Sequence, residues 1–131
     1  TVYDKNLILA EKLLEKRYKH KIRVVHISGA FFFGSATQLI SQFDEFLGTR
    51  YLILVYDSEE LLDISAIFAL EDIMLRLKSQ RIKTLLVLKN EEVYEQLKKH
   101  DIVDNQHHVF FSEFEAINYA KTSCKKRIKR H

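Results

Sequence analysis

Unbroken apolar runs alternate along this chain with stretches in which apolar residues recur every three or four positions. The runs at 22–27, 51–56, 83–88 and 109–111 have the length and the β-branched or aromatic content of strands. The second and third runs show no apolar–polar alternation, which is typical of strands that are covered on both faces of a sheet. The pattern therefore predicts repeated strand–helix units.

Helical periodicity with capping residues marks the segments between these runs. Ser35 opens one helix with a glutamine three residues on, a capping-box spacing, and Gly48 suits a left-handed end of that helix. Further helices are predicted over about residues 5–18, over 65–79, after Asn90 and after Ser112. In the last of these we expect Phe114, Ile117 and Ala120 to face inward.

Strict alternation of strands and helices after residue 20 predicts an α/β fold with parallel pairing through right-handed crossovers. We expect a central, mostly parallel sheet of about four to five strands with four or five helices. Proline is absent, and no internal linker or repeat suggests a second domain. The chain divides into an N-terminal linker or helix (1–20), one domain (21–122) and a basic C-terminal tail (123–131).

Composition is that of a soluble globular domain, with 131 residues of which 47% are hydrophobic and 30% charged. No apolar run approaches the roughly 20 residues that span a bilayer, and the first residues, TVYDKN, do not look like a secretion signal. The only cysteine, Cys124, leaves no partner for an internal disulfide.

The net charge of +3 hides an uneven distribution. Six of the last eleven residues are basic and none is acidic, which leaves 15 basic and 18 acidic residues in the rest of the chain. We expect this tail to be solvated; next to a membrane it could contact anionic lipid, at roughly 1 kcal/mol per basic residue. Nucleic acid is a weaker interpretation, because no second basic stripe with aromatic residues is present.

The sequence offers no recognisable catalytic, cofactor or metal motif. The three glycines form neither a dinucleotide fingerprint nor a P-loop, and the six histidines lack metal-ligand spacing. His26 is expected to be a hydrogen-bonded core or edge residue. Asp57 and Lys89 both follow strands, as in a phospho-accepting receiver, but the acids that would hold Mg²⁺ after the first strand are missing. We therefore expect neither an enzyme nor a cofactor.

Two segments next to helix starts are the candidate sites. The aromatic one comprises Phe32, Phe33, Gly34 and Ser35; its phenylalanines are expected to close the sheet's end and staple the following helix, with a ligand surface as the alternative. The other comprises Asp63, Ile64, Ser65 and Ala66, after an acidic loop. This segment is either a helix cap or a surface for partner docking or anion sensing.

At residues 21–121 the chain resembles the STAS domain, and most closely the C-terminal cytoplasmic STAS domain of SulP-type (sulfate permease family) anion transporters. The segments that carry the resemblance are IRVVHISGAFFFGSA, YLILVYDSEELLDISAIFALEDI, RIKTLLVLKN and HVFFSEFEAINYA. In anti-sigma-factor antagonists of this family the loop reads Asp-Ser-Ser-Gly or a close variant, and its first serine is phosphorylated. The matching Ile64 has no hydroxyl, a departure that favours the transporter branch; Ser65 is the adjacent hydroxyl.

The resemblance implies a non-catalytic regulatory domain on the cytoplasmic side of the inner membrane, as part of an integral membrane protein. Its expected partners are the transmembrane domain of its own transporter, a second copy in a homo-oligomer, and a weakly bound nucleotide or anion. The alternative is a free-standing signalling protein of the anti-sigma-antagonist type that binds a kinase partner.

Overall fold

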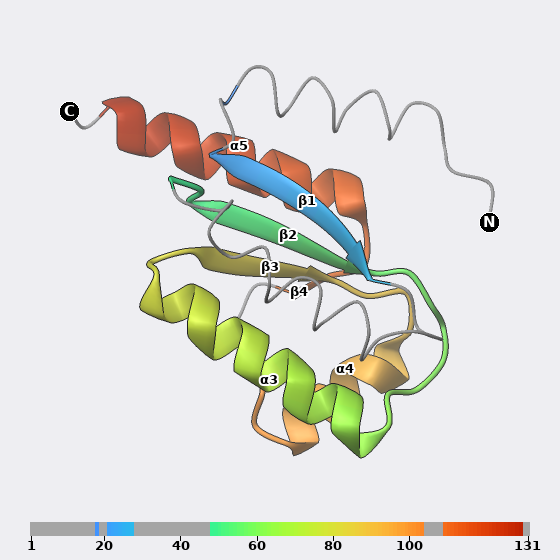
Figure 1. Cartoon of the computed structure of the whole chain (residues 1–131). Helices are drawn as coiled ribbons and strands as arrows, with labels where there is room; N and C mark the ends of the chain where they lie inside the picture. Colours follow the sequence, from blue (N-terminus) through green and yellow to red (C-terminus); the bar gives the residue numbers. More distant parts are fainter. Residues whose placement is uncertain (1–17, 19–20, 28–47, 104–108, 130–131) are drawn as a thin grey trace.

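The predicted sheet is present and all its described strands are parallel. The computed structural model describes residues 18, 21–27, 48–103 and 109–129, with side chains as far as 124. The strands lie in the order β1-β2-β3-β4 and are β1 (Ile22–Ile27), β2 (Tyr51–Tyr56), β3 (Lys83–Val87) and β4 (Val109–Phe110). The described helices are α3 (Ile64–Ser79), α4 (Glu91–Lys99) and α5 (Glu113–Lys129) (Figure 1).

Helices cover both faces of this sheet, with α3 and α4 on one side and α5 on the other (Figure 1). Successive side chains of a strand point to opposite faces, so β2 supplies both cores. Leu52 and Leu54 pack toward α3 and α4, whereas Ile53 and Val55 pack toward α5. Every residue of β2 is buried, which confirms the prediction of a strand covered on both faces.

The buried face of α5 differs from the prediction. Ile117 and Ala120 of α5 are buried as expected, but Phe114 is 45% exposed, so that prediction is wrong. The buried face of α5 begins instead with Glu113, whose carboxylate lies near His26 of β1. Once Glu113 faces inward, the neighbouring Phe114 is turned toward solvent.

The remaining predictions concern the turn at Gly48, the helices expected before residue 48 and the end of the domain. Gly48 has a φ of +86°, the left-handed conformation expected there. The predicted helices over 5–18 and after Ser35 lie outside the described residues, apart from Tyr18, which is helical. Helix α5 continues past residue 122, where we placed the end of the domain, and Cys124 is 1% exposed. None of the described helices is both long and apolar enough to cross a membrane.

Candidate docking loop and adjacent charged row

The segment between β2 and α3 (57–63), here called the docking loop, is held by side chains of α4 and its cap. The side-chain amide of Gln96 donates to the Leu62 carbonyl and accepts from the Leu62 N–H, both at 2.9 Å. Asn90, the N-cap of α4, donates to the Glu59 carbonyl at 2.7 Å. These bonds satisfy backbone groups that have no strand or helix partner, so they define the loop's path.

Asp63 ends the docking loop and caps α3. Its Oδ1 accepts a hydrogen bond from the Ala66 N–H at 2.8 Å, and its carbonyl accepts from Ile67 at 3.0 Å. This confirms the cap interpretation for Asp63. The carboxylate also places a negative charge at the start of α3, where an anion would otherwise be favoured. That charge weighs against the anion-sensing interpretation, which stays a prediction.

The residues of the second candidate site divide between surface and core. Asp63, Ile64 and Ser65 are exposed at the start of α3, whereas Ala66 is 5% exposed and belongs to the core. The aromatic candidates Phe32, Phe33, Gly34 and Ser35 lie outside the described residues. The structure therefore describes only the Asp63–Ala66 half of the predicted pair of segments.

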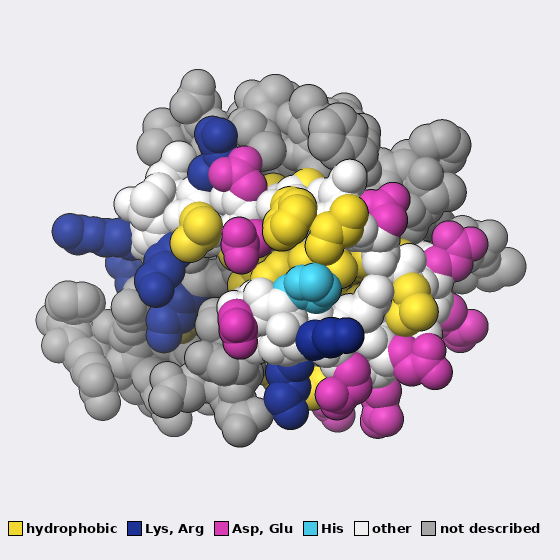
Figure 2. All heavy atoms as spheres, turned by 90° about the horizontal axis from the view of Figure 1, so that it is seen from below, with side chains coloured by type: hydrophobic (Ala, Val, Ile, Leu, Met, Phe, Trp, Pro, Cys, Tyr) yellow, Lys and Arg dark blue, Asp and Glu magenta, His cyan; other side chains and the backbone are white. Residues whose placement is uncertain are grey.

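An apolar stripe runs along the solvent side of α3. Ile64, Phe68 and Leu75 are 51%, 59% and 60% exposed, and Leu61 of the docking loop is 53% exposed. The spacing from 64 to 68 and from 68 to 75 places these three on one helical face, opposite the buried Leu70. Figure 2 shows hydrophobic side chains gathered near the middle of the face that carries α3 and α4, with charged side chains around them. We call Leu61, Ile64, Phe68 and Leu75 the apolar stripe.

A shallow groove of about 400 Å³ lies beside this stripe. It is lined by Leu61 of the docking loop and by five polar residues of α4, namely Glu91, Glu92, Glu95, Gln96 and Lys99. The stripe and the groove thus present apolar side chains with an acidic border.

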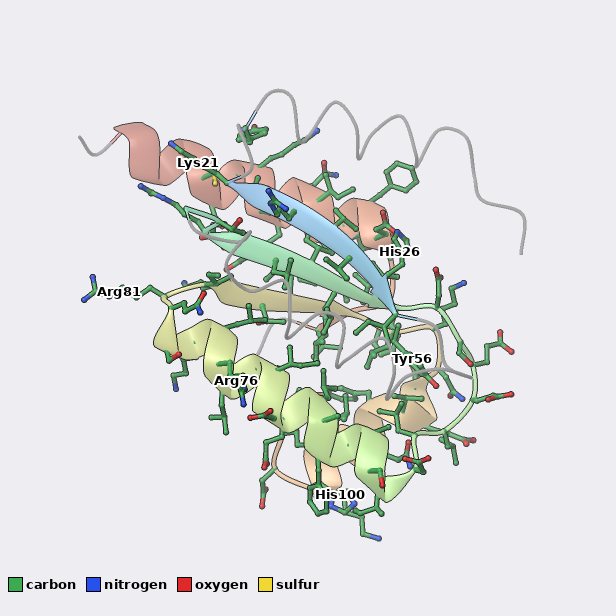
Figure 3. All side chains as sticks on the ribbon, in the orientation of Figure 1. Lys21, His26, Tyr56, Arg76, Arg81 and His100 are labelled. Atoms are coloured by element: carbon green, nitrogen blue, oxygen red, sulfur yellow. The ribbon has the colours of Figure 1, made fainter. Side chains whose placement is uncertain are left out.

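Four charged side chains from four different parts of the chain meet where the strands end. His26, labelled near the end of β1 in Figure 3, has its Nδ1 2.8 Å from Asp57 Oδ2 and its Nε2 3.6 Å from Glu113 Oε1. Lys89, which follows β3, places Nζ 3.0 Å from Asp57 Oδ1. We call Glu113, His26, Asp57 and Lys89 the charged row.

The charges of the row change the pKa of Asp57. Partial burial acts to raise the pKa of this carboxyl group, but hydrogen bonds from Lys89 and His26, together with their charges, outweigh it and hold the pKa below its usual value. Asp57 is therefore ionised at neutral pH. Among the described residues, no three His, Cys, Asp or Glu side chains are placed so that they could hold a metal ion.

The sequence located part of this row. Asp57 and Lys89 stand out because they follow strands, and His26 was expected to be hydrogen-bonded, which the structure confirms. Glu113 was missed, since a glutamate after a helix cap is ordinarily a solvated first-turn residue. The one feature of the sequence that could have pointed to Glu113 is its position next to Phe114, the residue expected to face inward.

Comparison with known families assigns the fold. A family model described as the STAS domain matches residues 14–116, and no curated protein matches the chain. The match spans all four described strands and includes α3 with the docking loop before it. Together with the four-stranded parallel sheet and its helices, it shows that this chain belongs to the STAS domain family.

Proposed function

We propose that this STAS domain is a non-catalytic regulatory module that binds a protein partner through the docking loop and the apolar stripe. The observation that carries the proposal is the exposure of Ile64 and Phe68 on the solvent side of α3. Half-exposed large apolar side chains aligned on one helix face, beside a charged border, are typical of protein-interaction surfaces.

We further propose that the partner is the transmembrane region of a SulP-type anion transporter, to which the domain is attached. Ile64 supports this, because it replaces the hydroxyl that a phosphorylation switch would need at that position. The basic residues near the end of the chain suit a position close to anionic lipid. The domain would then act on the cytoplasmic side of the membrane.

The attachment is tested first by reading the gene around the segment that encodes this chain. We expect apolar membrane-spanning segments to be encoded before residue 1; a gene without them contradicts the transporter assignment. Docking is then tested by measuring the affinity of this domain for that membrane region in lipid nanodiscs. Phe68→Lys should weaken binding at least about tenfold, which is the size expected for loss of a central apolar anchor.

The matched control is Phe114→Lys, since Phe114 is similarly exposed but lies on α5, which covers the opposite face of the sheet. Equal losses for both variants, or no loss for Phe68→Lys, would contradict docking through the stripe. Sedimentation of the isolated domain reports whether a second copy occupies the stripe instead.

A free-standing anti-sigma-antagonist-like signalling protein is the second candidate, favoured by the exposure of Ser65. Its hydroxyl is accessible at the helix start, so sterics do not exclude phosphorylation. Incubation with an anti-sigma-type kinase and ATP, followed by mass spectrometry, separates the two functions. Single, stoichiometric phosphorylation at Ser65 would favour this candidate over the transporter domain.

A further inference from the structure

The charged row alternates in sign when His26 is protonated. Its order in space is Glu113, His26, Asp57, Lys89, and these residues come from the start of α5, from β1, from the docking loop and from the segment after β3. Each positive group then lies next to a carboxylate. The row thus connects α5 on one side of the sheet with the docking loop that leads to α3 on the other.

The ring nitrogens of His26 indicate where the protons lie. Asp57 is ionised, so the 2.8 Å contact requires a proton on Nδ1. In a neutral ring with that proton, Nε2 carries a lone pair, and this lone pair faces the Glu113 carboxylate at 3.6 Å. Two acceptors facing each other repel, whereas a second proton on Nε2 turns the same contact into an attraction.

Burial of the Glu113 side chain favours its neutral form, whereas two other features of its position favour the carboxylate that leaves the proton on the histidine. Glu113 is the first residue of α5, where the helix dipole favours a negative charge. Its side chain is 6% exposed, so water screens its interaction with His26 weakly. Among the described residues, the carboxylates of Asp57 and Glu113 contact the ring, and Lys89 contacts the other oxygen of Asp57.

We propose that His26 is a proton-operated latch, which in its protonated form ties the start of α5 and the first residue of the docking loop to the end of β1. Loss of the proton as pH rises reverses the contact with Glu113 and loosens that end of α5. The contact between Asp57 and Lys89 does not depend on this proton, so the loop keeps its tie to the segment after β3. This device stands independently of the proposed partner.

The latch is tested by ¹⁵N NMR of the histidine rings in the full chain between pH 5.5 and 9, with His26 assigned by its disappearance in His26→Gln. The expected result is a doubly protonated His26 ring at neutral pH and a titration midpoint above the roughly 6.5 of an ordinary histidine. A midpoint at or below that value overturns the proposal.

Two variants give shifts of opposite sign that a purely structural role would not produce. Glu113→Gln removes a negative charge beside Nε2 and should lower the midpoint, whereas Lys89→Met removes a positive charge near the ring and should raise it. Lys89 is 46% exposed, so its variant tests the row even where Glu113→Gln fails to fold. A midpoint that Lys89→Met leaves unchanged or lowers overturns the proposal.

Stability provides an independent measurement. The wild-type chain should exceed His26→Gln in free energy of unfolding by more at pH 6 than at pH 9. A group that binds its proton more tightly in the folded state stabilises the fold at low pH, and this stabilisation is lost as pH rises through its midpoint. His100→Gln is the matched control, since His100 is exposed at the end of α4 (Figure 3). The same pH dependence in both variants overturns the latch.

Discussion

The side-chain amide of Gln96 pairs with the backbone of Leu62 in the same way that a neighbouring strand would. It accepts from the Leu62 N–H and donates to the Leu62 carbonyl, 34 residues away in sequence. Leu62 is 7% exposed, so water cannot readily replace these bonds. One residue of α4 thereby fixes the docking loop just before the cap of α3, and it makes the position of Leu61 and Ile64 depend on α4.

Replacing Gln96 with alanine should destabilise the fold through Leu62. Both backbone groups would lose their partners in a partly buried position, and we expect a loss of about 1–3 kcal/mol in the free energy of unfolding. Urea denaturation measures this loss. The control is Glu95→Ala on the exposed side of the same helix, which should change stability by no more than about 0.5 kcal/mol. Similar values for the two variants would show that the pairing contributes nothing.

Asp63→Ala should remove the cap of α3 and cost about 1 kcal/mol, because the Ala66 N–H loses its acceptor. Asp63→Ser keeps an acceptor oxygen and should recover most of that loss. Both effects can be measured by chemical denaturation at neutral pH. If the serine variant is as unstable as the alanine variant, the charge of Asp63 matters more than its hydrogen bond.

Asp57 should make the domain sensitive to acid. Its pKa is lower in the folded chain than in the unfolded chain, so the unfolded state takes up a proton first as pH falls. The stabilisation is therefore complete above the ordinary aspartate pKa of about 4 and is lost as pH falls through the lower, folded value. Thermal melts from pH 7 down to pH 3 should show a smaller stability loss for Asp57→Asn than for the wild type. A steeper loss in the variant would contradict this assignment.

The sequence was enough to predict the layer architecture because the physical signals there are local and strong. Tyr51–Tyr56 is entirely hydrophobic, and a run of this length with β-branched and aromatic residues is typical of a strand covered on both faces. The caps at Asp63 and Asn90 were likewise readable, since each requires only an acceptor side chain two or three residues before a free amide.

The charged row could be predicted only in part. Strand ends in a parallel sheet meet at one edge, which makes Asp57 and Lys89 candidates from their positions alone. Glu113 joins them through the rotation of α5, and one residue of helical phase decides whether Glu113 or Phe114 faces inward. Hydrophobicity alone would turn Phe114 inward. In the structure Glu113 faces inward instead, and its carboxylate lies near His26. The pairing of Gln96 with Leu62 was equally out of reach, because it depends on how α4 packs.

Two leucines on α3 test the assignment of its faces. Leu70 is 3% exposed and packs in the core beneath the sheet, so Leu70→Ala should cost about 2–5 kcal/mol through lost burial and the cavity it leaves. Leu75 is 60% exposed, and Leu75→Ala should change stability by no more than about 0.5 kcal/mol. Urea denaturation of the pair measures both. Comparable costs would mean that the stripe is packed against part of the chain in solution.

The end of α5 tests where the folded domain stops. Cys124 is 1% exposed and packs with Ile117 and Ala120 against the sheet, although we predicted a domain boundary at residue 122. A chain that ends at 122 loses this buried side chain and should be less stable than one that ends at 124, by about 1 kcal/mol for the apolar area re-exposed. Denaturant unfolding of the two truncations measures the difference, with the full chain as reference. Equal stability of the two truncations would place the functional end of the domain at 122 and make the remainder of α5 a separate tail.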